Sequence, residues 1–166
     1  AERLKIPVAA SASGLGALPV EHPLSLGLVQ RGGTYQANHA CRQADVLLAL
    51  GVRFDDRTSS SWIPGYSFTI PPTRLIHVDI DPEEIGRNYP VALGLMADVR
   101  TFLRQILVEL DRRGHDGAPT DKRGKWLDAI DGYRREWDAF VAPGMVDDST
   151  PINPQRAAVE IDKALP

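Results

Sequence analysis

The chain has 166 residues, enough for one compact domain with or without part of a second. Lys and Arg number 19 against 22 Asp and Glu, so the formal net charge of −3 shows no basic excess for a nucleic-acid partner. The longest apolar run, residues 46–52, is far shorter than the ~20 residues of a membrane-spanning helix, and the single Cys41 excludes an intrachain disulfide. We therefore expect a cytoplasmic protein with neither nucleic acid nor a membrane as partner.

The first third of the chain predicts a strand, a loop and a helix in turn. Residues 6–10 form a short apolar run suited to a buried strand, and residues 11–23 contain two glycines and two prolines that indicate a connecting loop. Thr34 is the expected N-cap of a helix that can lie close against a sheet. The small-residue face of that helix comprises Ala37, Ala40, Cys41 and Ala44.

Two longer apolar runs, residues 45–50 and 75–80, predict buried parallel strands. Residues 53–73 between them are too many for an ordinary connection unless they have structure or function of their own, and part of this segment is expected to be an exposed loop. Strands that alternate with helices at Gly- and Asp-rich turns indicate an α/β fold with a doubly wound parallel sheet. Such a sheet binds ligands at the carboxyl ends of its strands.

Helices dominate the rest of the chain. After a weaker apolar run at residues 91–96, Asp98 is expected to cap a helix that ends at Gly114. Its apolar face comprises Val99, Phe102, Leu103, Ile106, Leu107 and Leu110. An aromatic stripe predicts a further helix, and it comprises Trp126, Ile130, Tyr133, Trp137 and Phe140. Residues 142–151 are typical of a linker. The final helix has the expected cap Asn153-Pro154 and the inward-facing residues Ala158, Ile161 and Leu165.

Three segments are expected to meet at one edge of the sheet, namely residues 14–16, 32–38 and 53–57. Glycines allow close backbone approach, a helix start at Thr34 offers N–H groups to a phosphate, and the two arginines of the third segment can neutralise it. The alternative is that the second segment is only a tight helix start and that Arg53, Asp55, Asp56 and Arg57 form solvated ion pairs.

Several other polar residues could have either a structural or a functional role. Asp79 and Asp81 follow a predicted strand, where one can hold a ribose hydroxyl and the other can cap the next helix. The four histidines lie too far apart in the sequence for a metal site, and Asp98 is read as a helix cap rather than a catalytic acid. An independent NAD-dependent oxidoreductase would need the third glycine of a dinucleotide fingerprint, which the segment at 14–16 lacks.

Six motifs, taken in order, together resemble the central domain of thiamine-diphosphate-dependent enzymes, closest to the acetolactate (acetohydroxyacid) synthase branch. They are IPV at 6–8, GLGA at 14–17, HPL at 22–24, GTYQAN at 33–38, ADVLLALGVRFDDR at 44–57 and IHVDIDPEEIG at 76–86. The resemblance implies a Rossmann-like middle module of a three-domain subunit. The outer domains of neighbouring subunits hold thiamine diphosphate and magnesium.

This resemblance divides the chain into a nucleotide-binding domain (1–113), a helix and linker (114–151) and the start of the C-terminal diphosphate-binding domain (152–166). Both ends are then expected to be truncated, and a sheet without its first strand exposes an edge that favours homodimers, homotetramers or poor stability in isolation. The family's catalytic glutamate lies in the first domain and its Gly-Asp-Gly…Asn metal motif in the third, so no catalytic residue or metal ligand is assigned here.

In the synthase branch the middle domain holds FAD, and related members hold ADP or no nucleotide. The resemblance carries a cofactor-binding role to Ala12, Ser13, Gly14, Gly33, Thr34, Gly51, Arg53, Asp55, Asp56, Arg57, Asp79, Ile80, Asp81, Ile85, Asp98 and Val99. Arg31-Gly32-Gly33 stands where synthases usually have Met-His-Gly. The implied parent enzyme decarboxylates a 2-keto acid and ligates the two-carbon unit to an acceptor. The alternative is an oligomerisation scaffold without nucleotide binding, from a related decarboxylase or C–C hydrolase.

Overall fold

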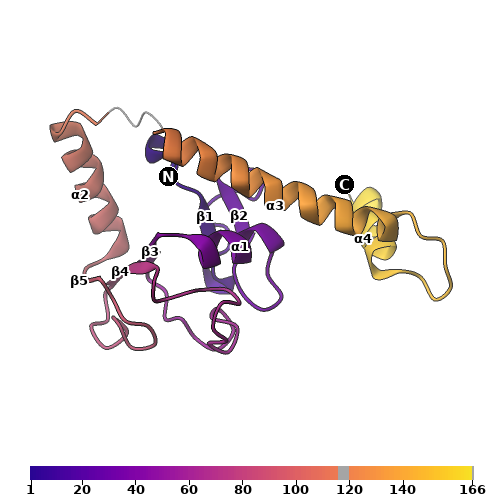
Figure 1. The fold of residues 1–166 in the computed structure, drawn as a ribbon, viewed down its shortest axis with the longest axis horizontal. Helices are drawn as coiled ribbons and strands as arrows, with labels where there is room; N and C mark the ends of the chain where they lie inside the picture. The colour runs from indigo at the N-terminus through magenta and orange to yellow at the C-terminus, as the bar shows by residue number, and fades with distance from the viewer. Residues whose placement is uncertain (116–119, 166) are drawn as a thin grey trace.

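The computed structural model describes residues 1–115 and 120–165 (Figure 1). Residues 116–119 and 166, which fall within the two C-terminal segments expected from the sequence, lie outside this description. The strands are β1 (Val8–Ala10), β2 (Ser25–Leu28), β3 (Val46–Leu50), β4 (Arg74–Asp79) and β5 (Leu93–Met96). The α-helices are α1 (Tyr35–Gln43), α2 (Val99–Arg112), α3 (Asp121–Met145) and α4 (Pro154–Ala164), with short 3-10 helices at Glu2–Leu4 and Ala12–Gly14.

All strand pairs in the described residues are parallel, which confirms the predicted α/β fold. β1 pairs with β2, and β4 lies between β3 and β5, with Leu48, Ile76 and Leu93 in register. β2 was not predicted from the sequence. Gly27 of β2 has φ +77, and a Cβ at this position would lie 2.8 Å from Cγ2 of Thr34. Only glycine fits here, and it interrupts the apolar pattern by which a strand is predicted.

The core forms where α1 packs against β2 and α3. Ala37, Ala40 and Cys41 on α1 are buried together with Leu26 of β2 and Ile130 of α3. Small side chains on α1 allow this close approach, as its predicted small-residue face requires. Figure 1 shows α3 running past α1 and continuing beyond it to α4. The core continues through Phe54, Phe68 and Leu75 towards the three-stranded sheet.

The Cys41 thiol is a sensitive probe of this core. Burial raises the pKa of Cys41 to about 12, so almost no thiolate exists at neutral or mildly alkaline pH. We expect a disulfide reagent to leave Cys41 unmodified in native buffer and to label one thiol per chain in denaturing urea. Rapid labelling in native buffer would show that α1 does not pack against the core.

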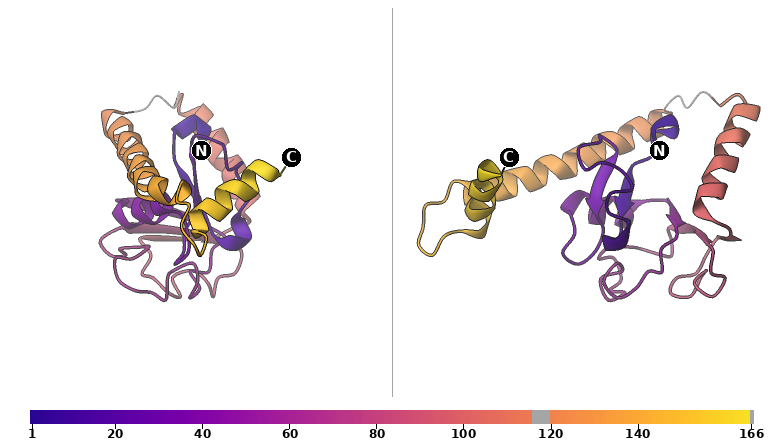
Figure 2. Two further views of the ribbon diagram at one scale, coloured as in Figure 1. Left: turned by 90° about the vertical axis from the view of Figure 1, so that its right-hand side faces the viewer. Right: turned by 180° about the vertical axis from the view of Figure 1, so that it is seen from behind.

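Two apolar faces are more exposed than the sequence predicted. In β3, Val46 and Leu48 are 44% and 43% exposed, so β3 is not a fully buried strand. Helix α2 begins after its predicted cap and is followed by Gly114 with φ +63, but its predicted apolar face is not buried. Leu107, for example, is 48% exposed, and Figures 1 and 2 show α2 standing at one end of the molecule.

The C-terminal helices also differ from their predicted packing. α3 extends through residues 142–145, including Pro143, so the predicted linker begins later than expected. α4 starts at the predicted cap, where Asn153 Oδ1 accepts from the Gln155 N–H at 3.0 Å. However, Ile161 is 61% exposed, and α4 packs on the far end of α3, which projects from the rest of the described chain (Figure 2). Among the described helices, none has the length and apolarity to cross a membrane.

Candidate functional site

A cleft of ≈ 380 Å³ opens where the loops after β1, β2 and β3 meet. The residues that line it are Ala12, Gln30, Arg31, Gly32, Asp56 and Arg57. The structure therefore brings together the three loops that were expected to meet, although β1 and β2 form one sheet and β3 belongs to another. The two glycines of the first loop, Gly14 and Gly16, do not line this cleft, and Ala12 stands there instead.

The turn between β2 and α1 forms one wall of the cleft. The Gly33 N–H donates to the Gln30 carbonyl and the Thr34 N–H to the Leu28 carbonyl, each at 2.8 Å. Thr34 occupies the predicted N-cap position, but its hydroxyl donates to the Leu26 carbonyl at 2.5 Å instead of capping the helix. The prediction of Thr34 as the N-cap residue is therefore confirmed, although its side chain secures the turn to β2 rather than capping the helix.

A buried polar network supports this wall from behind. The Asn38 side-chain amide donates to the Gln30 carbonyl at 2.9 Å, and the Ser67 hydroxyl donates to Asn38 Oδ1 at 2.8 Å. The Ser60 hydroxyl lies 2.7 Å from that of Ser67, and both side chains are fully buried. Since each polar group has a partner, the network holds the β2–α1 turn and the loop after β3 in one arrangement.

The loop after β3 supplies the opposite wall. Asp55 Oδ1 accepts from the Thr58 N–H at 2.8 Å, and this hydrogen bond is the main cause of the lowered pKa of Asp55. Asp55 therefore closes the turn that presents Asp56 and Arg57 to the cleft. Ser60, Ser61 and Trp62 follow with φ between 54 and 58, a left-handed run that costs about 1–3 kcal/mol for each residue.

Arg53 points elsewhere. Its Nε lies 3.8 Å from Glu84 Oε1, and its carbonyl accepts from the Asn88 side chain at 2.9 Å. The arginine pair predicted to neutralise a phosphate is thus divided, with Arg57 at the cleft and Arg53 at the β4–β5 connection. Gln30 and Arg31 line the cleft but were not predicted as site residues, although the Arg31-Gly32-Gly33 tripeptide departs from the Met-His-Gly usual in synthases.

The remaining predicted site residues do not line the cleft. They are Ser13 after β1, and, after β3, β4 and β5, Gly51, Asp79, Ile80, Asp81, Ile85, Asp98 and Val99. Asp79 Oδ1 accepts from the Asp81 N–H at 3.0 Å, and Asp81 Oδ1 accepts from the Glu83 N–H at 2.9 Å. Asp98 Oδ1 accepts from the Thr101 N–H at 2.8 Å, as its predicted cap role requires. The carboxylates of Asp79, Asp81 and Asp98 thus accept hydrogen bonds from nearby backbone N–H groups and stabilise turns or a helix start.

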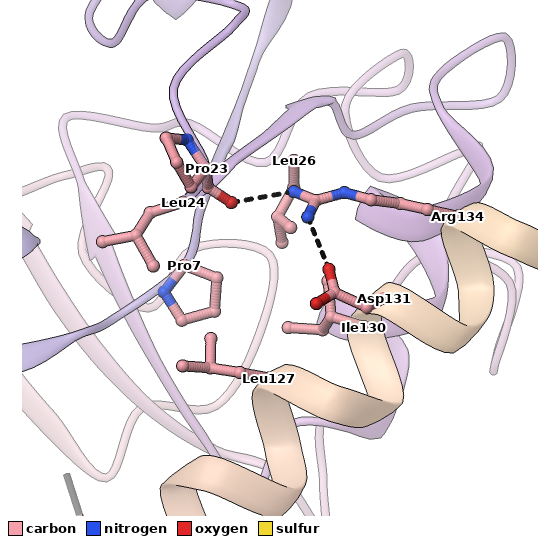
Figure 3. A pocket seen from close by; sticks show the side chains of 8 residues that line it. All are labelled: Pro7, Pro23, Leu24, Leu26, Leu127, Ile130, Asp131 and Arg134. Atoms are coloured by element: carbon pink, nitrogen blue, oxygen red, sulfur yellow. Dashed lines mark hydrogen bonds and ion pairs between the residues drawn. The ribbon is translucent and has the colours of Figure 1, made fainter.

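A second, smaller cavity of ≈ 160 Å³ lies under α3 (Figure 3). The Arg134 guanidinium donates to the carbonyls of Pro23 and Ser25 at 3.0 and 2.8 Å and to Asp131 Oδ1 at 2.7 Å. The other lining side chains are apolar and come from α3, from Leu26 of β2, from Leu24 just before β2 and from the two prolines (Figure 3). Because its polar groups already pair with one another, this cavity is a packing gap at the base of α3.

No group of three or more His, Cys, Asp or Glu side chains within residues 1–115 and 120–165 is placed to hold a metal ion. The cleft is the candidate site because its lining brings together two guanidinium groups, one carboxylate and an open glycine. This set suits a small anionic ligand that also carries hydroxyl groups.

Residues 1–106 match the family model described as thiamine pyrophosphate enzyme, central domain. The chain is 35% identical to a probable acetolactate synthase large subunit of Methanocaldococcus jannaschii over 165 residues, which are 99% of this chain and 26% of that protein. It is 38% identical over 133 residues to the acetolactate synthase isozyme 3 large subunit of Escherichia coli (80% and 22% of the two chains). It is 37% identical over 158 residues to the chloroplastic acetolactate synthase 1 of Zea mays (95% and 23%). The chain thus spans about a quarter of the length of these relatives.

Proposed function

Because this chain belongs to the central-domain family of thiamine pyrophosphate enzymes, we propose that it is the nucleotide-binding central domain of an acetolactate synthase-like enzyme. The observation that carries the proposal is the cleft between the loops after β1, β2 and β3. It lies where an α/β sheet of this kind binds its ligands, beyond the carboxyl ends of parallel strands.

The lining residues suit FAD or ADP. Arg31 and Arg57 can neutralise a diphosphate, Gly32 leaves room for close backbone approach, and Asp56 can accept hydrogen bonds from ribose hydroxyls. The volume of ≈ 380 Å³ falls within the range of about 300–1,000 Å³ found for small-molecule sites. By the resemblance to the synthase branch, a nucleotide bound there would have a structural role rather than a net redox role.

The proposed whole enzyme decarboxylates a 2-keto acid and ligates the two-carbon unit to an acceptor. Thiamine diphosphate and magnesium would be held by residues outside this chain, and the partners would be the other domains of the same cytoplasmic enzyme in a homodimer or homotetramer. The exposed apolar faces of α2 and β3 support such partners, because large exposed apolar patches commonly mark interaction surfaces.

Nucleotide binding is tested by titrating the purified protein with ADP and with FAD in a calorimeter, with flavin fluorescence as a second readout. We expect saturable binding, and we expect Arg57→Gln to weaken it about tenfold because a charge-assisted hydrogen bond is lost. Arg53→Gln is the matched control, since Arg53 lies in the same loop but points to Glu84. If neither nucleotide binds, the scaffold alternative replaces this proposal.

A further inference from the structure

We infer that His39 is a pH-sensitive contact between α1 and the outer part of α3, residues 133–140. The neutral His39 ring holds the two helices together, and its protonation loosens them. The inference goes beyond the proposed function and is independent of nucleotide binding. Aromatic contacts between the helices, the position of Arg42 at the His39 ring and the charges around this ring support it.

An aromatic cluster joins α1 to the outer part of α3, where the two helices lie side by side (Figure 1). The centroid of the His39 ring lies 4.0 Å from that of Tyr35 on α1 and 5.0 Å from that of Tyr133 on α3. Tyr35 also stacks on Trp137, with ring centroids 5.9 Å apart and an interplanar angle of 18°. Trp137 lies 5.6 Å from Phe140, which is 73% exposed. His39 therefore lies at the more buried end of this cluster, between the two helices.

Two hydrogen bonds join the same helices on either side of His39. The Tyr35 hydroxyl donates to Glu136 Oε2 at 3.1 Å, and the Tyr133 hydroxyl donates to Gln43 Oε1 at 2.8 Å. Tyr35 and Gln43 stand four residues before and after His39, so all three share one face of α1. Displacement of the His39 ring from α3 would therefore disturb both hydrogen bonds.

The contact between Arg42 and His39 requires a neutral imidazole. Nη2 of Arg42 lies 2.9 Å from Nδ1 and 3.0 Å from Nε2 of His39. A neutral imidazole has one nitrogen that can accept the Arg42 N–H, whereas both nitrogens of an imidazolium are donors. Arg42 is also held from the loop after β3, because its Nη1 donates to the Gly65 carbonyl at 3.3 Å. Protonation of His39 would thus replace a hydrogen bond with a contact between two positive charges.

The groups around His39 favour its neutral form. Those that are charged or can titrate are Tyr35 and Arg42 on α1 and Tyr133 and Glu136 on α3. Burial first, and the Arg42 charge second, lower the pKa of His39, while the attraction of Glu136 opposes them less strongly. Because this pKa is lower in the folded than in the unfolded chain, the stability that His39 contributes is complete above about pH 6.5. It is lost as the pH falls from there through the folded-state pKa.

The test is urea unfolding of the purified wild type, His39→Phe and Arg42→Gln at pH 7.5 and 5.5, followed by circular dichroism. His39→Phe keeps an aromatic ring between Tyr35 and Tyr133 but cannot be protonated. Between the two pH values, we expect the urea midpoint of the wild type to fall by about 0.3 M more than that of His39→Phe. Arg42→Gln is expected to show an intermediate fall, because burial still disfavours the imidazolium when the Arg42 charge is removed.

A second variant and a local measurement complete the test. His39→Gln offers an amide oxygen to Arg42 and does not titrate, so it takes the place of His39→Phe if that variant is unfolded at pH 7.5. Amide hydrogen exchange, corrected for its intrinsic pH dependence, locates the effect. At pH 5.5 we expect residues 133–140 to lose about threefold more protection in the wild type than in the His39 variant, while β4 changes equally in both.

Three results would overturn the inference. The first is an equal fall in the urea midpoint for the wild type and the His39 variants. The second is a smaller fall for the wild type, which would show that the tyrosine rings stabilise the imidazolium. The third is a loss of protection in β4 as large as that in residues 133–140, which would assign the acid effect to the whole chain rather than to the contact between α1 and α3.

Discussion

Replacing Gly33 with alanine is expected to lower the free energy of unfolding by about 3 kcal/mol. A Cβ at this position would lie 2.2 Å from the Leu28 carbonyl oxygen and 2.8 Å from the Gln30 nitrogen. Both are main-chain atoms, and the Leu28 carbonyl already accepts from the Thr34 N–H, so neither can move without breaking the turn. Equilibrium unfolding in urea, followed by circular dichroism, measures the effect.

The neighbouring Gly32 provides a matched control. A Cβ at Gly32 meets no atom within 4 Å, so Gly32→Ala is expected to change the free energy of unfolding by less than about 0.5 kcal/mol. Because Gly33 shapes the wall that carries Arg31, Gly33→Ala is also expected to weaken ADP binding under conditions where the variant remains folded. Equal stabilities for the two alanine variants would show that the β2–α1 turn is not closed in this way.

Replacing Ile130 with alanine is the second substitution with a large expected effect. Ile130 is 2% exposed and inserts from α3 into the core beside Leu26, next to the ≈ 160 Å³ cavity under the helix (Figure 3). Truncating a buried isoleucine costs about 2–5 kcal/mol, and the cost rises with the volume of the cavity that remains. We expect a value in the upper half of that range, because truncation would enlarge a cavity that already exists.

Ile161→Ala on α4 is the control for this substitution. Ile161 is 61% exposed, so its truncation is expected to cost less than about 0.5 kcal/mol. Limited proteolysis adds a second readout, since Ile130→Ala should increase cleavage within α3 while Ile161→Ala should not. Similar unfolding free energies for the two variants would contradict the docking of α3 described above.

Local patterns determined the elements. The apolar runs at residues 45–50 and 75–80 became β3 (Val46–Leu50) and β4 (Arg74–Asp79), and Asp98 and Asn153 begin α2 and α4 as predicted. Strands and helix starts depend on side-chain periodicity and on hydrogen bonds that span a few residues, so the sequence contains the information directly. β2 was not predicted, because its Gly27 is required by the close approach of Thr34, and no local sequence pattern reveals that contact.

The candidate site was predictable only in part. The order of loops and strands was enough to expect that the loops after β1, β2 and β3 meet, because parallel strands end on the same side. The division into two sheets, β1–β2 and β3–β4–β5, was not expected. The direction of each side chain could not be predicted from the sequence, since it depends on loop dihedral angles and on partners that are distant in the chain. Only the tertiary structure decided that Glu84 draws Arg53 away, that Arg31 faces the cleft, and that α2 leaves its apolar face exposed.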